Sequence, residues 1–206
     1  MRQSEKDVYK TITRKGEGLY KEKGSKFISL ALSVTSEDEM KSGMEGLKKQ
    51  YHDARHHCYA FCIEKDYSFF RFSDDGEPSG TAGRPIYNQI LSYEVTNAMV
   101  VVIRYFGGTK LGASGLVNAY KTAARDALAS ARIVRKFIKD FYEIICDYPE
   151  TNDVMKLIND DVINVISQDF EIKCKMTISV RKSESGRILD KLGKNNKLVI
   201  NYLKTD

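Results

Sequence analysis

The sequence predicts an α+β protein with two domains. Short alternating apolar segments, typical of half-buried strands, are interspersed with helical patterns along the 206 residues. An apolar run at 99–103 leads through a glycine-rich turn into a long helix. After residue 132 the pattern restarts, and the order β-α-β-β-α-β fills about 70 residues, as in a ferredoxin-like unit. We therefore expect one domain over 1–134 and a second over 135–206.

Before the apolar run at 99–103, itself expected to be a buried strand, the pattern predicts four strands and two helices. The strands are expected over 7–20, 26–34, 57–63 and 67–72, the first two forming a hairpin. Ser36 is expected to cap a helix, because an acidic residue follows three positions later and Met40, Met44 and Leu47 recur at helical spacing. A short helix is expected over 86–92.

After the turn, a long alanine-rich helix is expected from about 114 to 131. Its inward face is predicted to hold Val117, Tyr120, Ala124 and Leu128. In the second domain, strands are predicted over 137–146, 162–172, 175–180 and 198–203. One helix is expected to open at 149–153, and another to be capped by Ser183 and to end at Gly193.

Charge and composition limit the possible classes of protein. The net charge is +5, and all of the excess lies in residues 1–135, which hold 21 basic and 16 acidic residues against 12 and 12 afterwards. This distribution favours an anionic partner for the first domain. No apolar stretch reaches the roughly 20 residues that span a membrane, and the N-terminus lacks the apolar core of a signal peptide. We therefore expect a cytoplasmic protein without a membrane partner.

The cysteines predict neither a disulfide nor a metal site. Cys58 and Cys62 are expected on one face of a strand, as buried reduced thiols. Their spacing to His56 and His57 only loosely approximates a zinc motif. We expect no metal and no cofactor.

The glycine-rich turn predicts an anion site. Glycines stand at 107, 108, 112 and 115, between a buried strand and a helix start, where backbone N–H groups and the helix dipole favour negative charge. Ala113 stands where a Walker loop requires lysine, and a GxGxxG motif is absent from the sequence. Arg104 and Lys110 add positive charge beside the turn. The alternative is that the glycines only permit a tight strand–helix connection.

Side chains near the turn offer weaker candidates for chemistry. The acidic loop holds Asp74, Asp75 and Glu77, which could act as acids or bases with His56. The alternative is a structural role, in which the aspartates cap local backbone or pair with arginines. As neighbours on a strand, His56 and His57 should point to opposite faces, one toward a groove and the other toward solvent. Tyr105 and Phe106 could stack on bases or belong to the core.

Several stretches resemble the IMPACT family, including its bacterial YigZ-type members. They are KGSKF at 23–27, HHCYAF at 56–61, RFSDDGEPSGTAGRPI at 71–86 and VVVIRYFGGTKLGASGLVNAY at 100–120. The resemblance implies that the N-terminal domain is an α/β sandwich of the ribosomal-protein-like (domain 2-like) type. It also implies a ferredoxin-like C-terminal domain resembling the last domain of elongation factor G.

The resemblance further implies a binding protein associated with RNA or the ribosome and linked to regulation of translation. RNA, the ribosome or a translation-associated protein is the expected partner. The residues expected to bind the ligand are Lys26, Arg71, Arg84, Arg104, Gly107, Gly108, Lys110, Gly112 and Ser114. Two alternatives stay open: an enzyme acting on a phosphorylated or acidic small molecule through the 74–83 and 107–115 loops, and a module that binds only protein. A binding protein is favoured over an enzyme.

Overall fold

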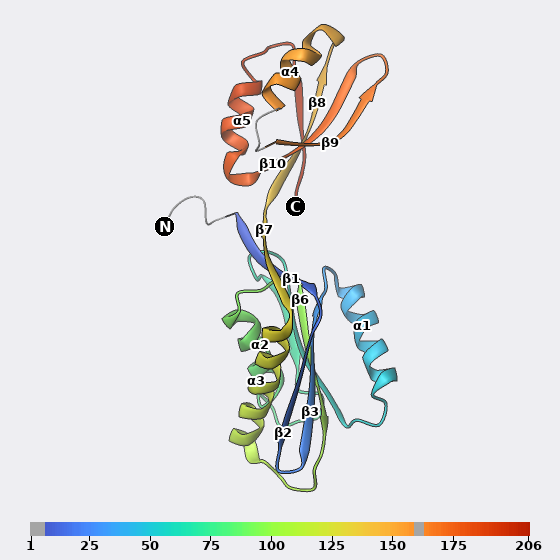
Figure 1. Ribbon diagram of the computed structural model, residues 1–206, viewed down its shortest axis with the longest axis vertical. Coiled ribbons are helices and arrows are strands. Elements are labelled where there is room, and N and C mark those ends of the chain that lie inside the picture. The colour runs from blue at the N-terminus through green and yellow to red at the C-terminus, as the bar shows by residue number, and fades with distance from the viewer. Residues whose placement is uncertain (1–6, 159–162) are drawn as a thin grey trace. The chain divides into compact units, whose positions relative to one another are not determined.

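The computed structural model describes residues 7–158 and 163–206, and it is an α+β protein with several sheets (Figure 1). The described chain divides into two compact units. The first is Tyr9–Arg135, and the second is Lys136–Asp206 together with Asp7 and Val8. The identities predicted for the two domains are not tested by this division and stay predictions.

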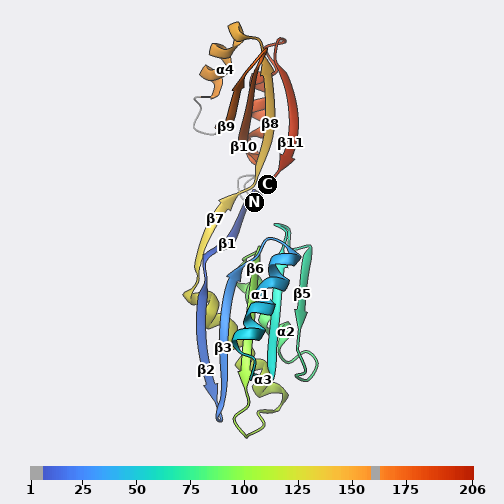
Figure 2. The ribbon, with the colours of Figure 1, turned by 90° about the vertical axis from the view of Figure 1, so that its right-hand side faces the viewer.

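The first unit is built on a five-stranded antiparallel sheet (Figure 2). In sheet order, the strands are β2 (Gly16–Glu22), β3 (Ser25–Ser33), β6 (Ala98–Tyr105), β4 (His56–Ile63) and β5 (Phe69–Ser73). The apolar run expected to form a buried strand lies in β6, at the middle of the sheet. Its residues 98–103 are fully buried because helices cover both faces there.

Helices α2 (Gly83–Ser92) and α3 (Gly112–Ser130) cover one face of this sheet, and α1 (Glu37–Gln50) covers the other (Figures 1 and 2). The predicted cap of α1 is confirmed, since the Ser36 hydroxyl accepts a hydrogen bond from the Glu39 N–H at 3.2 Å. The three apolar residues predicted on its inner face are buried.

Two expectations for the first unit are wrong. The single strand expected over 7–20 is two strands, β1 (Val8–Arg14) and β2, which are separated at Lys15 and belong to different sheets. β2 begins at Gly16, where a Cβ would lie 2.0 Å from the Ala127 carbonyl oxygen, so glycine is required there. β1 pairs with β7 (Arg132–Phe137), a strand that the sequence pattern did not predict, while β2 forms the expected hairpin with β3. On α3, the side chain of Val117 is exposed, and Leu116 occupies the inner face instead.

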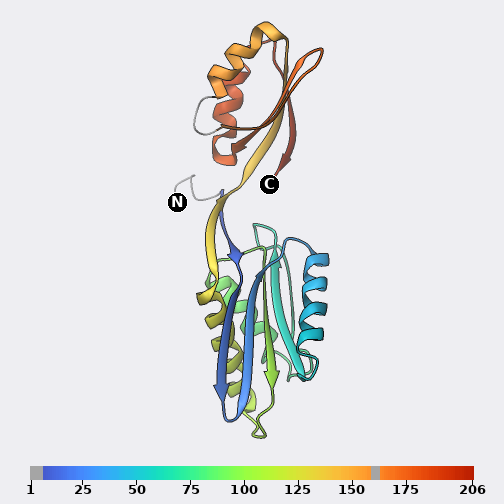
Figure 3. The ribbon, with the colours of Figure 1, turned by 45° about the vertical axis from the view of Figure 1, so that its right-hand side comes forward.

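The second unit contains a four-stranded antiparallel sheet with helices on one face (Figure 3). In sheet order, the strands are β11 (Val199–Thr205), β8 (Lys139–Cys146), β10 (Cys174–Arg181) and β9 (Ile163–Phe170). Helix α4 (Thr151–Ile158) follows the short 3₁₀ turn η2 (Tyr148–Glu150), and α5 (Ser185–Leu192) follows η3 (Lys182–Glu184). Residue 162, where a strand was expected to begin, lies outside the described residues.

The predicted N-terminal cap of α5 is also wrong. Ser183 does not cap the helix but lies in η3, where its backbone N–H donates to Asp7 Oδ2 at 3.0 Å. The end of the helix is where the sequence predicts it: α5 stops at Leu192, and Gly193 is its C-terminal cap with φ −67°.

Asp7 ties the start of the described chain to the second unit. Its carboxylate, 3% exposed, accepts hydrogen bonds from Arg181 Nε at 2.7 Å and Nη2 at 2.8 Å. Burial raises the pKa of Asp7, but the hydrogen bonds from Arg181 and Ser183 outweigh it and lower the pKa to about 2. Because the folded pKa lies below the unfolded one, this stabilisation is complete above pH 4 and is lost as the pH falls through about 2.

We expect Asp7→Asn to lower the free energy of unfolding of the second unit by about 2 kcal/mol at neutral pH. The deficit should shrink as the pH approaches 2, where the native aspartate also loses its charge. Urea unfolding by circular dichroism at several pH values measures this, with exposed Asp190→Asn as the control. A deficit that stays constant with pH would show that charge is not the cause.

Candidate functional site

The glycine-rich turn begins where β6 passes close to another turn. Gly107 packs on the backbone of the β2–β3 turn, and a Cβ at this position would lie 1.8 Å from the Gly24 carbonyl carbon. Its N–H donates to Ser25 Oγ at 3.2 Å. Gly107 therefore serves the close approach of two backbone segments, a structural role that differs from the tight strand–helix connection considered from the sequence.

The later glycines shape the start of α3. Gly108 and Gly112 have φ of +86° and +73° and have open space around the position of a Cβ. The helix begins at Gly112, two residues earlier than predicted. Among the described residues, no side chain caps its N-terminus at Leu111. The first N–H groups of this 19-residue helix therefore keep their partial positive charge for a ligand.

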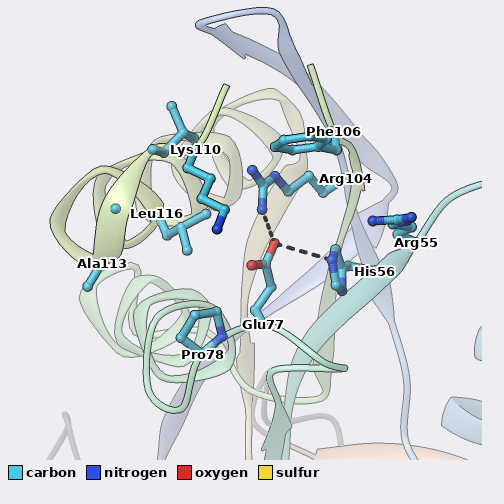
Figure 4. A pocket seen from close by; sticks show the side chains of 11 residues that line it. Arg55, His56, Glu77, Pro78, Arg104, Phe106, Lys110, Ala113 and Leu116 are labelled. Carbon is cyan, nitrogen blue, oxygen red and sulfur yellow. Dashed lines mark hydrogen bonds and ion pairs between the residues drawn. The ribbon is translucent and has the colours of Figure 1, made fainter. Parts of the chain in front are cut away.

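A pocket of about 450 Å³ lies at this helix start. It is bounded by the beginning of α3, the end of β6, the beginning of β4 and the 74–83 loop (Figure 4). Three cationic side chains, one histidine, one carboxylate and one aromatic ring line it: Arg55, Arg104, Lys110, His56, Glu77 and Phe106. The turn and the acidic loop identified in the sequence thus contribute to one pocket.

A buried ion pair forms one wall of the pocket. Arg104 Nη1 donates to Glu77 Oε1 at 2.6 Å, with the two side chains 7% and 4% exposed. The Arg104 guanidinium lies between the rings of Phe27 and Phe106, at 5.4 and 5.6 Å from their centroids. Its Nε is buried without a hydrogen-bond partner in the part of the chain that the structure describes. Arg104 therefore retains an unused donor.

Tyr120 of α3 fixes the position of the Glu77 carboxylate through a hydrogen bond. Its hydroxyl donates to Glu77 Oε1 at 2.8 Å and accepts a hydrogen bond from Cys58 Sγ at 3.3 Å. Burial raises the pKa of both Tyr120 and Cys58, so both keep their protons at neutral pH and act as donors. All four cysteines are free and buried, as predicted for Cys58 and Cys62.

The two histidines point to opposite faces of β4, as predicted. His56 faces the pocket, where its Nε2 lies 3.9 Å from Glu77 Oε1, and its Nδ1 lies 2.8 Å from the Asp75 carbonyl oxygen. His57 is buried rather than solvent-exposed, and its Nε2 lies 3.1 Å from the Tyr51 carbonyl oxygen. Only His56 is placed to contact a ligand in the pocket.

The two aspartates of the loop bind backbone. Asp74 accepts hydrogen bonds from the N–H groups of Gly80, Ala82 and Gly83, and so caps the start of α2. Asp75 Oδ2 accepts from the His57 N–H at 2.6 Å. Of the three acidic candidates, Glu77 alone lines the pocket.

The structure does not bring the other predicted ligand-binding side chains to the pocket. Lys26 lies over the ring of Tyr105, its partner in the β3–β6 pairing. Arg104 pairs with Phe27, so its side chain lies on the opposite face of the sheet from Lys26. Arg71 pairs with Glu37 of α1, on the opposite face of the sheet. Alternation along the strands separates these two cations from Arg104.

Two further candidates do not line the pocket. Arg84 stacks on the Phe72 ring at 5.7 Å, and Ser114 is exposed on the first turn of α3. Arg55 and Tyr120 were missed as site residues. Arg55 precedes a strand in a segment without a motif, and Tyr120 was assigned to the core, so only the fold shows their proximity to Glu77.

Within residues 7–158 and 163–206, no group of three or more His, Cys, Asp or Glu side chains is arranged to hold a metal ion. Helices long and apolar enough to cross a membrane are likewise absent from those ranges.

The fold and the pocket define an α+β protein whose first unit presents a cationic pocket beside a glycine-rich turn. A model of the Impact N-terminal domain matches residues 23–128, half of the chain. The chain is 34% identical to the IMPACT family member YigZ of Escherichia coli (strain K12) over 151 residues, 72% of this chain and 74% of YigZ. The chain therefore belongs to the IMPACT family and is of the bacterial YigZ type.

Two solved structures are similar to the chain. A crystal structure described as that of a hypothetical protein has a TM-score of 0.70 and 27% identity, covering 96% of this chain and 98% of that one. The structure of the two-domain translational regulator Yih1 has 26% identity and a TM-score of 0.39, covering 58% of this chain and 48% of that one.

Proposed function

We propose that this chain is an RNA-binding protein linked to translation, and that its pocket holds the phosphate of an unpaired nucleotide. The observation that carries the proposal is the convergence of Arg55, Arg104 and Lys110 with the uncapped start of α3. Cationic side chains and helix N-termini are the donors that bind phosphate in proteins. Glu77 offsets one of these charges, so the pocket keeps an excess of positive charge.

Phe106 favours an unpaired nucleotide over a duplex. Phe106 is 46% exposed at the edge of the pocket, where its ring contacts the Arg104 guanidinium and leaves much of its surface open to solvent. Exposed aromatic rings beside cations are the platforms on which unstacked bases bind. This argues against the alternative that Phe106 belongs to the core.

The ribosome is the partner we propose for such a site, because it offers structured RNA with unpaired nucleotides. We further propose that residues 1–134 form the ribosomal-protein-like domain and that residues 135–206 form the ferredoxin-like domain. The strand order β11-β8-β10-β9, with one helix after the first strand and one after the third, supports the second assignment.

The test is a titration of a labelled RNA hairpin with an unpaired loop, and of purified ribosomes, at two salt concentrations. We expect the double variant Arg55→Ala/Lys110→Ala to bind the RNA about tenfold more weakly and with a shallower salt dependence, because two phosphate contacts are lost. The matched control is Lys48→Ala/Lys49→Ala, which removes the same charge from exposed positions on α1, on the other face of the sheet.

Equal losses in the two double variants would mean that only net charge attracts RNA, and the pocket would not be the site. Equal binding by the wild type and Arg55→Ala/Lys110→Ala would reject the pocket outright.

A second candidate function is an enzyme acting on a phosphorylated small molecule. It is favoured by one observation, the position of His56 Nε2 beside Glu77 in the pocket, where an imidazole could act as a base. A thermal-shift screen of metabolites would support it through a hit that stabilises the wild type and His52→Ala but not His56→Ala. The alternative of a module that binds only protein predicts no response to RNA in the titration above.

A further inference from the structure

The cationic pocket also contains a hydrogen-bond acceptor that the fold orients. His56 Nδ1 lies 2.8 Å from the Asp75 carbonyl oxygen, and a carbonyl can only accept, so Nδ1 carries the proton of the neutral ring. Nε2 is then a lone-pair acceptor on the pocket side. A histidine whose far nitrogen is held by a backbone carbonyl has a fixed tautomer and ring orientation.

Glu77 supplies further acceptor capacity next to it. One carboxylate oxygen accepts from Arg104 and Tyr120, and Figure 4 shows the other turned away from Arg104 and His56. His56 Nε2 and Glu77 Oε1 are 3.9 Å apart, which is beyond hydrogen-bond range. The His56 acceptor is therefore not occupied by Glu77. The pocket thus presents acceptors beside its phosphate-binding donors.

This combination limits the chemistry of the ligand. Arg55, Arg104 and Lys110 repel a second cation, so the donor that meets His56 must be neutral. The donor must also belong to a molecule that carries a phosphate. A ribose hydroxyl next to a phosphate meets both conditions, and the 2′-hydroxyl is the group that separates RNA from DNA. A volume of about 450 Å³ lies within the range of pockets that bind small ligands.

We propose that His56, with Glu77 beside it, accepts a hydrogen bond from the 2′-hydroxyl of the nucleotide whose phosphate the pocket holds, so that the site selects RNA over DNA. The inference rests on the proposed phosphate-binding function. It adds the sugar as the feature recognised and assigns specificity to His56, whereas Arg55 and Lys110 supply affinity for either nucleic acid.

The experiment compares three hairpins of one sequence, whose loop nucleotides are ribose, 2′-fluoro or 2′-deoxy. A 2′-fluoro group keeps the size and pucker of the ribose but cannot donate a hydrogen bond. We expect the wild-type protein to bind the ribose loop about tenfold more tightly than either substituted loop, the value of one hydrogen bond in a desolvated site. His56→Ala should lose this preference and bind the three loops equally. His52→Ala, at an exposed position outside the pocket, is the matched control.

The outcomes separate the two proposals. If all three loops bind the wild type equally and the Arg55→Ala/Lys110→Ala variant binds none of them well, the pocket holds phosphate but does not recognise the sugar, and this inference is wrong. If no loop binds, the proposed function itself is wrong. A preference for ribose that persists in His56→Ala would also overturn the role of His56. The comparison of loops on the wild-type protein stays decisive even where a variant is unstable.

Discussion

Replacing Gly107 with alanine is expected to destabilise the first unit by about 3 kcal/mol. The added Cβ would lie 1.8 Å from the Gly24 carbonyl carbon and 2.1 Å from the Ser25 nitrogen. Both are backbone atoms, so no side-chain rotation relieves the clash, and the β2–β3 turn must move. Urea unfolding followed by circular dichroism measures the loss.

Two glycines serve as controls for Gly107. Gly46, in the middle of α1, has no atoms within 4 Å of the place that a Cβ would occupy, so Gly46→Ala should stabilise the protein by up to about 1 kcal/mol. Gly108 has open space but a φ of +86°, so Gly108→Ala should cost about 1 kcal/mol from backbone strain. If Gly107→Ala unfolds at the same urea concentration as Gly108→Ala, the close backbone contact is not what requires glycine.

Neutralising Glu77 is expected to have the second large effect. Glu77→Gln leaves the buried Arg104 guanidinium without its counterion, which should cost about 3 kcal/mol. The pocket then holds three cationic side chains and no carboxylate, so an added anion should replace the lost charge. We expect inorganic phosphate to raise the melting temperature of Glu77→Gln more than that of the wild type, because it binds the folded state of the variant more tightly.

The control for this experiment is sodium chloride at matched ionic strength, which screens charge but does not fit a phosphate site. Glu37→Gln breaks the ion pair of Arg71 on the other face of the sheet, where phosphate should give no added stabilisation. If phosphate raises the melting temperatures of Glu77→Gln and Glu37→Gln equally, the anion acts on the whole protein and not in the pocket.

The sequence predicts the parts of this site better than their arrangement. The strand at 99–103, the glycine-rich turn and the acidic loop are recognisable because apolar runs, glycine clusters and acidic clusters are local patterns. The sharing of one carboxylate by Arg104 and Tyr120 is not local. It depends on the path of the loop from Asp74 to Gly80, where Asp74 binds three backbone N–H groups and Gly76 has a φ of +84°.

The placement of the cationic side chains was equally beyond prediction from the sequence pattern. Lys26 and Arg104 both lie close to the glycine-rich turn in the fold, and the family resemblance groups them as ligand-binding residues. They lie on opposite faces because Lys26 pairs with Tyr105 and Arg104 with Phe27 in the β3–β6 register. Register between strands distant in the chain is a tertiary property, so the face on which each cation lies could not be assigned from the pattern.

The decisive measurement for the proposed pocket is the position of bound RNA on the protein. Amide chemical shifts, recorded by NMR during titration with the ribose-loop hairpin, report contact at individual backbone N–H groups. We predict that the largest changes fall on Gly112, Ala113 and Ser114, at the start of α3, and on His56. Changes confined to α1 or to the second unit, with these amides unmoved at saturation, would contradict an RNA site in the pocket.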